Sequence, residues 1–180
     1  MKNKVFVATS IDGYIADKNG DIDFLHSIPN PEGDDMGYSE FMEDVDALIM
    51  GRTTFETVCN FDVPWPYDKP VFVLSNSLEK IAPEYKEKAT LVNGSLNSIL
   101  DQIHKKGYHN LYIDGGKTIQ SFLKEELIDE ITITIIPVLL GGGTSLFGKL
   151  DKKQRFRCVE TKRYLDQVVQ NHFKKVIKSE

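Results

Sequence analysis

The sequence of 180 residues has few cysteines and no long apolar run. Its two cysteines, Cys59 and Cys158, lie far apart, form no C-x-x-C pair and lack the histidine spacing that is typical of zinc sites. We therefore expect reduced thiols and no metal site. No apolar run approaches the roughly 20 residues that a membrane-spanning helix needs, and the first residues lead into a short strand rather than a signal sequence. These absences predict a cytoplasmic protein.

A surplus of positive charge is also missing. Lysine and arginine number 22 against 27 aspartates and glutamates, which gives a formal net charge of −5. This balance argues against nucleic acid or an anionic membrane as the main partner. The hydrophobic share of 41% and the charged share of 27% are ordinary for a globular protein. Because the chain has no linker or internal repeat, we expect a single domain over residues 1–180.

What is present is an alternation of strand and helix patterns. Short β-branched or apolar runs predict strands at residues 4–10, 46–50, 70–74, 89–92, 111–113 and 131–136. Apolar residues at helical spacing predict helices at residues 35–45, 52–59, 96–105 and 117–127. A hairpin is expected from residues 156–164 and 167–177 around Leu165-Asp166. The order predicts an α/β domain with a mixed, mostly parallel sheet and an antiparallel edge, whose ligands bind beyond the carboxyl ends of the strands.

The first strand end with unusual chemistry is Gly51-Arg52-Thr53-Thr54. If a helix begins there, its free N–H groups face an anion, Gly51 allows close approach, the threonines donate, and Arg52 can bind a phosphate in a bidentate manner. The alternative is an ordinary helix start with a solvated arginine.

The second strand end is Asp114-Gly115-Gly116-Lys117-Thr118. Paired glycines leave room for a pyrophosphate at the start of a helix. The letters GKT do not complete a P-loop, and no G-x-G-x-x-G motif occurs. The alternative is a tight turn from strand to helix.

The third strand end is Ser75-Asn76-Ser77. A ribose that carries a phosphate needs hydrogen-bond donors and cations, whereas a free ribose hydroxyl is commonly bound by an acid. Small hydroxyl and amide groups suit the phosphorylated ribose, although a polar turn has the same composition. Together, the three strand ends predict a phosphorylated dinucleotide, NADPH, as cofactor.

Five segments in order, VFVATSIDGYIAD, ALIMGRTTFE, KPVFVLSNS, LYIDGGKTIQSFL and DEITITIIPVLLGGGTSLF, resemble the dihydrofolate reductase-like superfamily across nearly the whole chain. The S-x-D-G of Ser10 to Gly13 and the P-V-L-L-G-G-G of Pro137 to Gly143 are similar to the C-terminal reductase domain of the bifunctional riboflavin-biosynthesis deaminase-reductase and its stand-alone relatives. The zinc-binding deaminase domain of that enzyme has no counterpart in this sequence.

This resemblance implies a three-layer fold, with helices on both faces of an eight-stranded sheet, and NADPH bound across the strand ends. It implies contacts from Arg52, Thr53 and Thr54 to phosphates, from Ser75 and Asn76 to the adenosine ribose phosphate, from Gly115, Gly116, Lys117 and Thr118 to the pyrophosphate, and from Ala8 and Ile15 to the nicotinamide. The loop at residues 12–23 is expected to be a mobile cover.

The implied activity is NADPH-dependent reduction of a small nitrogen heterocycle, either 5-amino-6-(5-phosphoribosylamino)uracil, an intermediate of riboflavin biosynthesis, or a pteridine. A dihydrofolate reductase and a non-catalytic NADPH-binding module are the alternatives. Relatives of this kind often pair through sheet edges, so we expect a homodimer.

Two acids are candidates for the proton donor of the predicted site. Strict dihydrofolate reductases carry an acid on the helix before the M-G-R stretch, and Asp35 stands in a comparable place. On a helical projection Asp34 and Asp35 share a face with Tyr38, but acids also favour helix starts for their interaction with the helix dipole. Asp12 is the second candidate, either for substrate polarity or for shaping a turn. Thr134 could face the substrate cleft or could simply form strand.

Overall fold

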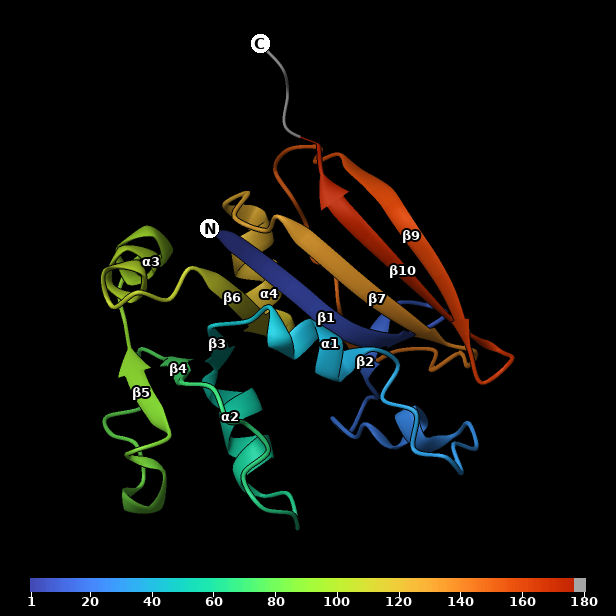
Figure 1. Cartoon of the computed structure of the whole chain (residues 1–180), viewed down its shortest axis with the longest axis horizontal. Helices are drawn as coiled ribbons and strands as arrows, with labels where there is room; N and C mark the ends of the chain where they lie inside the picture. Colours follow the sequence, from blue (N-terminus) through green and yellow to red (C-terminus); the bar gives the residue numbers. More distant parts are fainter. Residues whose placement is uncertain (177–180) are drawn as a thin grey trace.

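The computed structural model describes residues 1–176 and contains an eight-stranded sheet (Figure 1). The order across the sheet is β5-β4-β3-β6-β1-β7-β10-β9. Its strands are β1 (Lys2–Ser10), β3 (Ala47–Gly51), β4 (Val71–Leu74), β5 (Ala89–Val92), β6 (Asn110–Asp114), β7 (Glu130–Ile136), β9 (Phe156–Tyr164) and β10 (Val168–Lys175). The last residue of the predicted hairpin, Ile177, lies outside the described residues.

The pairing of the strands confirms the predicted mixed sheet. Neighbouring strands from β5 to β7 in the sheet order pair in parallel. β10 pairs antiparallel with both β7 and β9, which gives the expected hairpin at one edge. Because parallel strands all end at the same edge, the carboxyl ends of β1, β3, β4 and β6 meet where ligands of such sheets bind.

Helices cover both faces of the sheet, as predicted. α1 (Tyr38–Glu43) and α2 (Arg52–Cys59) pack on one face, and in Figure 1 they lie on the near side of the sheet. α3 (Leu96–Lys105) and α4 (Gly116–Lys124) pack on the other face. Covering on both sides explains why a central strand such as β3 is apolar without alternation, with residues 47–50 all buried. Short 3₁₀ turns occupy Asp23–His26 and Pro83–Tyr85.

The buried stripe of α4 shows how the sequence forms this helix. Ile119, Phe122 and Leu123 follow helical spacing and are almost completely buried against the sheet. The prediction placed the end of this helix at Leu127, but the helix ends at Lys124. Glu126 has φ of 59°, a left-handed conformation that a helix cannot contain.

The prediction for α1 was wrong at its start. A helix was expected from residue 35, but Met36 and Gly37 are left-handed, with φ of 53° and 82°, and α1 begins only at Tyr38. Asp34 and Asp35 therefore lie in the preceding turn rather than on a helical face. The helical projection used for these two acids does not apply to them.

A small second sheet was not predicted. β2 (Tyr14–Ala16) pairs antiparallel with β8 (Thr144–Ser145), so part of the expected cover loop is a strand. The backbones approach so closely that a Cβ atom on Gly143 would overlap the carbonyl oxygen of Ala16. This glycine is thus required for the pairing that joins the segment after β1 to the glycine-rich loop after β7.

No helix within residues 1–176 is long and apolar enough to cross a membrane.

Candidate active site

The three predicted strand ends lie side by side at the carboxyl edge of the sheet. β3 and β6 are neighbours, and Met50 pairs with Asp114 in register. β3 and β4 are neighbours as well, and Gly51 pairs with Leu74, the residue before Ser75. The residues that follow these strands therefore begin next to one another, although they are far apart in the sequence.

Two glycines let the strand ends pack without space between them. A Cβ atom on Gly51 would lie 2.9 Å from Oγ1 of Thr118, and one on Gly115 would overlap Oγ1 of Thr54. Real Cβ atoms essentially never make such contacts, so only glycine fits either position. The helix starts of α2 and α4 consequently meet, with a threonine of each helix against a glycine of the other strand end.

The starts of α2 and α4 carry free backbone N–H groups. Each helix has a glycine as its N-cap, Gly51 and Gly115, and neither has a side-chain capping hydrogen bond. α3, which begins after β5, differs, because the hydroxyl of Ser95 accepts a hydrogen bond from Ser98 N at 3.3 Å. Uncapped N–H groups and the positive ends of two helix dipoles meet at this edge, an arrangement that favours an anion.

Arg52 lies at the first position of α2 and is half exposed. Its guanidinium is 3.8 Å from Glu56 one turn later, a weak surface pair. A cation at the N-terminal end of a helix is unfavourable for the helix dipole, so Arg52 does not stabilise α2 by its position. Thr53 and Lys117 are exposed beside it at the two helix starts.

The segment between β1 and α1 packs onto the start of α4. A Cβ atom on Gly116 would lie 2.7 Å from Cδ1 of Ile15 and 3.3 Å from Cγ2 of Thr144. Ile15 therefore covers the second strand end, next to the predicted pyrophosphate position. Ala8, the other residue predicted to border the nicotinamide, is half-buried on β1 in register with Thr134 of β7.

Ser75 is buried and its hydroxyl oxygen accepts hydrogen bonds from Ser77 N at 3.2 Å and Leu78 N at 3.0 Å. These hydrogen bonds are those of a polar turn, the alternative interpretation of Ser75-Asn76-Ser77. Asn76 is exposed. The predicted contact of these two residues with a ribose phosphate stays a prediction.

Asp35, the first predicted proton donor, is exposed and shapes the turn before α1. Its carboxylate accepts hydrogen bonds from Gly37 N and Ser39 N, both at 2.9 Å. Hydrogen bonds from the hydroxyl and the backbone N–H of Ser39, together with Gly37 N, hold the pKa of Asp35 below its usual value. This geometry favours a structural role, since a carboxyl with a lowered pKa is a poor proton donor near neutral pH.

Asp12, the second candidate, joins two loops. Its carboxylate accepts hydrogen bonds from the Ser10 hydroxyl at 2.6 Å, from Leu140 N at 3.1 Å and from Gly141 N at 2.8 Å. The Ser10 hydroxyl, and then the two backbone N–H groups, lower the pKa of Asp12. The S-x-D-G motif thus anchors the glycine-rich loop. A role of Asp12 in shaping the loops, the alternative to a role toward the substrate, explains the hydrogen bonds of its carboxylate.

Sequence reasoning missed Asp114, the last residue of β6. It is half-buried on the α1 and α2 side of the sheet, and its carboxylate accepts a hydrogen bond from Gly115 N at 2.8 Å. Burial raises the pKa of this carboxyl above its usual value. The available signal was an acid at the carboxyl end of a predicted strand, directly before paired glycines.

The charge of Asp114 acts on three tyrosines, and we name the four residues together the tyrosine cluster: Tyr38, Tyr67, Tyr112 and Asp114. Burial, then the charges of Asp114 and Asp68, raise the pKa of Tyr38 to about 12. Burial and Asp114 also raise the pKa of Tyr67 and of Tyr112. The Tyr112 hydroxyl donates to Phe6 O at 2.9 Å, whereas the phenols of Tyr38 and Tyr67 have no hydrogen-bond partner within residues 1–176.

Thr134 faces the same side of the sheet. Gln170 of β10 is buried, and its side-chain nitrogen donates to Oγ1 of Thr134 and to Met36 O, both at 2.9 Å. This link ties the turn before α1 to the floor of the sheet. Because Thr134 accepts from Gln170, its own hydroxyl proton is left to donate.

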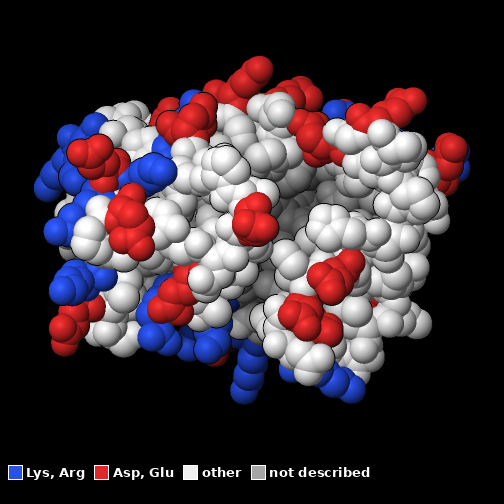
Figure 2. All heavy atoms as spheres, turned by 90° about the horizontal axis from the view of Figure 1, so that it is seen from below, with Lys and Arg blue, Asp and Glu red and all other residues white. Residues whose placement is uncertain are grey.

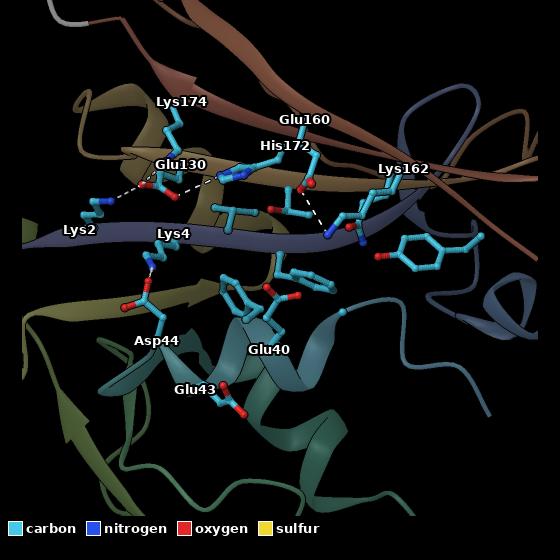
Figure 3. Close-up of a pocket in the computed structure, with 17 residues that line it drawn as sticks. Lys2, Lys4, Glu40, Glu43, Asp44, Glu130, Glu160, Lys162, His172 and Lys174 are labelled. Carbon is cyan, nitrogen blue, oxygen red and sulfur yellow. Dashed lines mark hydrogen bonds and ion pairs between the residues drawn. The ribbon is translucent and has the colours of Figure 1, made fainter. Parts of the chain in front are cut away.

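A groove of about 510 Å³ lies between α1 and the amino-terminal half of β1 (Figure 3). Most of its charged groups are paired. Glu130 contacts Lys2 at 2.6 Å, His172 at 3.1 Å and Lys174 at 3.8 Å, while Lys4 pairs with Asp44. Within residues 1–176, no group of three His, Cys, Asp or Glu side chains is placed to bind a metal ion.

The comparison with known families matches residues 4–170 to the RibD C-terminal domain. The chain belongs to this family, which confirms the resemblance drawn from the sequence. It is 36% identical to YwjB of Bacillus subtilis (strain 168) over 96% of this chain and 97% of that protein. It is 25% identical to 2,5-diamino-6-ribosylamino-4(3H)-pyrimidinone 5′-phosphate reductase of Methanothermobacter thermautotrophicus, over 75% of this chain and 77% of that enzyme.

Solved structures agree with the fold. A crystal structure from Shewanella sp. PV-4, of a protein assigned to riboflavin biosynthesis, superposes with a TM-score of 0.96 at 50% identity, covering 98% of this chain and 100% of that one. A deaminase and 5-amino-6-(5-phosphoribosylamino)uracil reductase of Thermotoga maritima superposes with a TM-score of 0.75 at 16% identity, covering 97% of this chain and 56% of that one. The second likeness concerns the fold alone.

Proposed function

We propose that the protein is an NADPH-dependent reductase of a small nitrogen heterocycle, of the pyrimidine reductase type found in riboflavin biosynthesis. Membership of the RibD C-terminal domain family and relatives with this reductase activity support the class of reaction. The observation that carries the proposal is the meeting of two uncapped helix starts over Gly51 and Gly115, where no side chain other than hydrogen fits. Such a place suits the phosphates of a dinucleotide.

The residues at this edge fit NADPH. The free N–H groups of α2 and α4, with Arg52, Thr53, Thr54, Lys117 and Thr118, would hold its phosphates, and Ser75 and Asn76 would lie toward the phosphorylated ribose. Ala8 and Ile15 would border the nicotinamide ring. When bound, the cofactor supplies a hydride to the substrate. The protein must orient the substrate, exclude water and hold a proton near the reacting atom.

In this proposal the tyrosine cluster is on the substrate side of the site. Asp114 is a better proton-holding group than Asp35 or Asp12, because its pKa is raised and theirs are lowered. The phenols of Tyr38 and Tyr67 are donors for a polar ring. β2 and β8 pair with each other, and Asp12 accepts hydrogen bonds from the glycine-rich loop. These segments would cover the nicotinamide and keep water out.

Titration of the purified protein with NADPH tests the proposal, with binding followed by heat or by quenching of its intrinsic fluorescence. We expect saturable binding, and no binding at millimolar NADPH would end the proposal. Arg52→Ala should weaken NADPH binding roughly tenfold, the size of one lost charge-assisted contact, and should affect NADH less. Equal losses for both cofactors would show that Arg52 does not contact the 2′-phosphate, the group by which NADPH differs from NADH.

A strict dihydrofolate reductase is the second candidate, and the position of Asp35 argues against it. The acid expected on the helix lies instead in an exposed turn. A non-catalytic NADPH-binding module would bind the cofactor without oxidising it in the presence of pyrimidines and pterins. Turnover assays distinguish the pyrimidine reductase, the dihydrofolate reductase and the non-catalytic module.

We further propose that the protein acts in the cytoplasm as a homodimer. Free thiols at Cys59 and Cys158 suit a reducing compartment. The outer edge of β9 supports pairing between two copies, as developed below.

A further inference from the structure

Gln170 is a buried polar side chain in β10, on the side of the sheet that α1 covers. Both protons of its side-chain nitrogen are used, one toward Met36 O and one toward Oγ1 of Thr134, each at 2.9 Å. Gln170 pairs in register with Thr134, which pairs in turn with Ala8. The side chain therefore reaches from the row of the sheet that contains the predicted nicotinamide neighbour to the turn before α1.

The bond from Gln170 to Met36 O joins this turn to the rest of the fold. The other hydrogen bonds of residues 30–37 stay within residues 30–41. Among the described residues 1–176, Gln170 is thus the one residue of another element that is hydrogen-bonded to this segment. Local bonds fix the shape of a turn but not its place over a sheet. The contact with Gln170 sets that place.

The turn needs such a contact because its backbone is strained. Met36 has φ of 53°, a conformation that a residue other than glycine keeps only where its surroundings enforce it. Its N–H donates to Asp34 at 2.7 Å, and its carbonyl oxygen accepts from Gln170. Gly37 is left-handed as well, and a Cβ atom there would lie 3.4 Å from the hydroxyl of Tyr164. Without the bond from Gln170, the turn is free to relax toward a commoner conformation.

α1 cannot compensate for a loosened turn. It has six residues, none of them is fully buried, and its N-cap Gly37 supplies no side-chain capping bond. A helix this short has little stability of its own. Its first residue, Tyr38, packs edge-on against Phe6, with ring centroids 5.7 Å apart, and lines a hollow of about 320 Å³ between α1 and residues 66–69. The place of Tyr38 over the sheet therefore depends on the turn that precedes it.

The turn ends a segment on the open side of the molecule. The segment between β2 and α1 lies along the lower side in Figure 1, and Figure 2 views the molecule from that side, where the surface is hollowed at its centre. A shift of the turn would change the surface that a ligand meets there. The starts of α2 and α4 belong to other elements and would keep their places.

We propose that Gln170 is a positioning residue of the reductase, which holds the turn at residues 34–37 so that the phenol of Tyr38 stays in place for the substrate. This inference rests on the proposed function, in which Tyr38 donates to the substrate ring. Gln170 acts through the turn and contacts neither substrate nor cofactor. A buried glutamine loses more side-chain freedom than leucine and needs partners for its polar atoms, so stability alone does not favour it inside a strand.

Hydrogen exchange tests the link between Gln170 and the turn. Gln170→Met keeps a similar size and removes the donor. The amides of residues 36–39, which local bonds protect, should exchange roughly fivefold faster, the effect of one lost hydrogen bond, while the amides of β1 and β7 exchange as before. Gln154→Met is the matched control, because Gln154 also donates to a backbone carbonyl, Leu123 O, near the end of α4. Unchanged exchange in Gln170→Met overturns the inference.

Steady-state kinetics connect the link to the reaction. NADPH oxidation is measured with 5-amino-6-(5-phosphoribosylamino)uracil and with 2,5-diamino-6-ribosylamino-4(3H)-pyrimidinone 5′-phosphate. In Gln170→Met, kcat should fall roughly tenfold through misplacement of Tyr38, with the KM for NADPH unchanged. Gln154→Met should keep both values.

Gln170→Glu separates the two bonds and serves as the second variant if Gln170→Met does not fold. Its carboxylate can still accept from the Thr134 hydroxyl but has no donor for Met36 O. It should lose as much kcat as Gln170→Met. Full activity of Gln170→Glu would show that the contact with Thr134 suffices, and would overturn the role of the turn.

The two proposals fail in different ways. A parent protein that oxidises NADPH with neither pyrimidine contradicts the proposed function, and the role of Gln170 in that reaction with it. An active parent whose Gln170→Met variant keeps kcat overturns the inference about Gln170 alone. So does a variant that loses kcat and NADPH affinity together, because such a loss indicates a general defect of the fold.

Discussion

At the scale of single residues, Gly115 has the strictest requirement in the site. It is left-handed, with φ of 87°, and its missing side chain makes room for the hydroxyl of Thr54. Gly94 is a natural comparison, because its φ of 118° is equally unsuited to other residues but nothing lies within 4 Å of its Cβ position. A comparison of alanine substitutions at these two glycines separates the cost of backbone strain from the cost of crowding between two helix starts.

Gly115→Ala should lower the free energy of unfolding by about 3 kcal/mol, from backbone strain together with overpacking, and should also weaken NADPH binding. Gly94→Ala should cost about 1 kcal/mol, from strain alone, and leave NADPH affinity unchanged. Urea denaturation and NADPH titration of both variants provide the check. Equal destabilisation would mean that Thr54 can move away, and normal NADPH binding by Gly115→Ala would remove the helix starts from the cofactor site.

The two acids Asp114 and Asp12 predict opposite dependences of stability on pH. Burial raises the pKa of Asp114 above its ordinary value of 3.8, so the folded protein holds this proton more tightly than the unfolded chain. Its ionisation therefore lowers stability as the pH rises from 3.8 through the raised pKa. The pKa of Asp12 is lowered, so its contribution is present above 3.8 and is lost as the pH falls toward its folded value.

The stability of Asp114→Asn relative to the parent protein should accordingly be higher at pH 7 than at pH 4. The stability of Asp12→Asn relative to the parent protein should be lower at pH 7 than at pH 4. Asparagine keeps an acceptor for Gly115 N, so the change at position 114 removes mainly the charge. Thermal unfolding of both variants at the two pH values gives the comparison. A pH-dependent change in stability of the same sign in both variants would show that burial does not determine the pKa of Asp114. Reductase activity should fall in Asp114→Asn if this carboxyl holds the proton.

What sequence could and could not predict is clearest for these acids. The glycine-rich strand ends were recognised because local composition marks a turn from strand to helix. Asp114 was missed because its environment comes from Tyr38 and Tyr67, which are distant in sequence and close only in the folded protein. Asp35 was misplaced because two left-handed residues interrupt the helix that a periodic pattern had predicted.

At the scale of elements, the hairpin of β9 and β10 was predicted with its turn at Leu165-Asp166, and the structure confirms it. Both turn residues are left-handed, with φ of 48° and 60°, as in a type I′ turn, although neither is the glycine or asparagine that such turns favour. β2 and β8 were missed because strands of three and two residues carry no periodic signal and form only through a long-range contact.

Replacing the turn by Leu165→Asn and Asp166→Gly should raise the free energy of unfolding by about 1 kcal/mol, because the new residues adopt left-handed backbone with less strain. Equilibrium unfolding in urea measures the change. A loss of stability instead would indicate that the half-buried side chain of Leu165 packs more favourably than its backbone strain costs.

At the scale of the whole molecule, β9 is an edge strand that pairs with β10 on one side. It is nine residues long and exposes Val159 among charged neighbours such as Arg157 and Glu160. A long free edge readily pairs with another chain unless charges or irregularities protect it. β9 carries one irregularity, because Val159 has no partner between His172 and Phe173 of β10.

We predict that two copies pair through β9, and sedimentation equilibrium should give the mass of two chains. Val159→Lys, which adds charge to this edge, should shift the equilibrium toward single chains, while Asp151→Lys outside the strand should not. A parent protein that sediments as one chain at micromolar concentration would exclude the dimer.

The central position of β1 has a consequence for how the chain folds during synthesis. β1 lies between β6 and β7, so during synthesis it has no partner in this sheet until residues 110–136 have followed it. For most of translation its apolar residues must remain unpaired or be shielded by other factors, and nucleation must await the closure of a very large loop. Folding should therefore start late, in one cooperative step, and slow codons before residue 110 should bring little benefit.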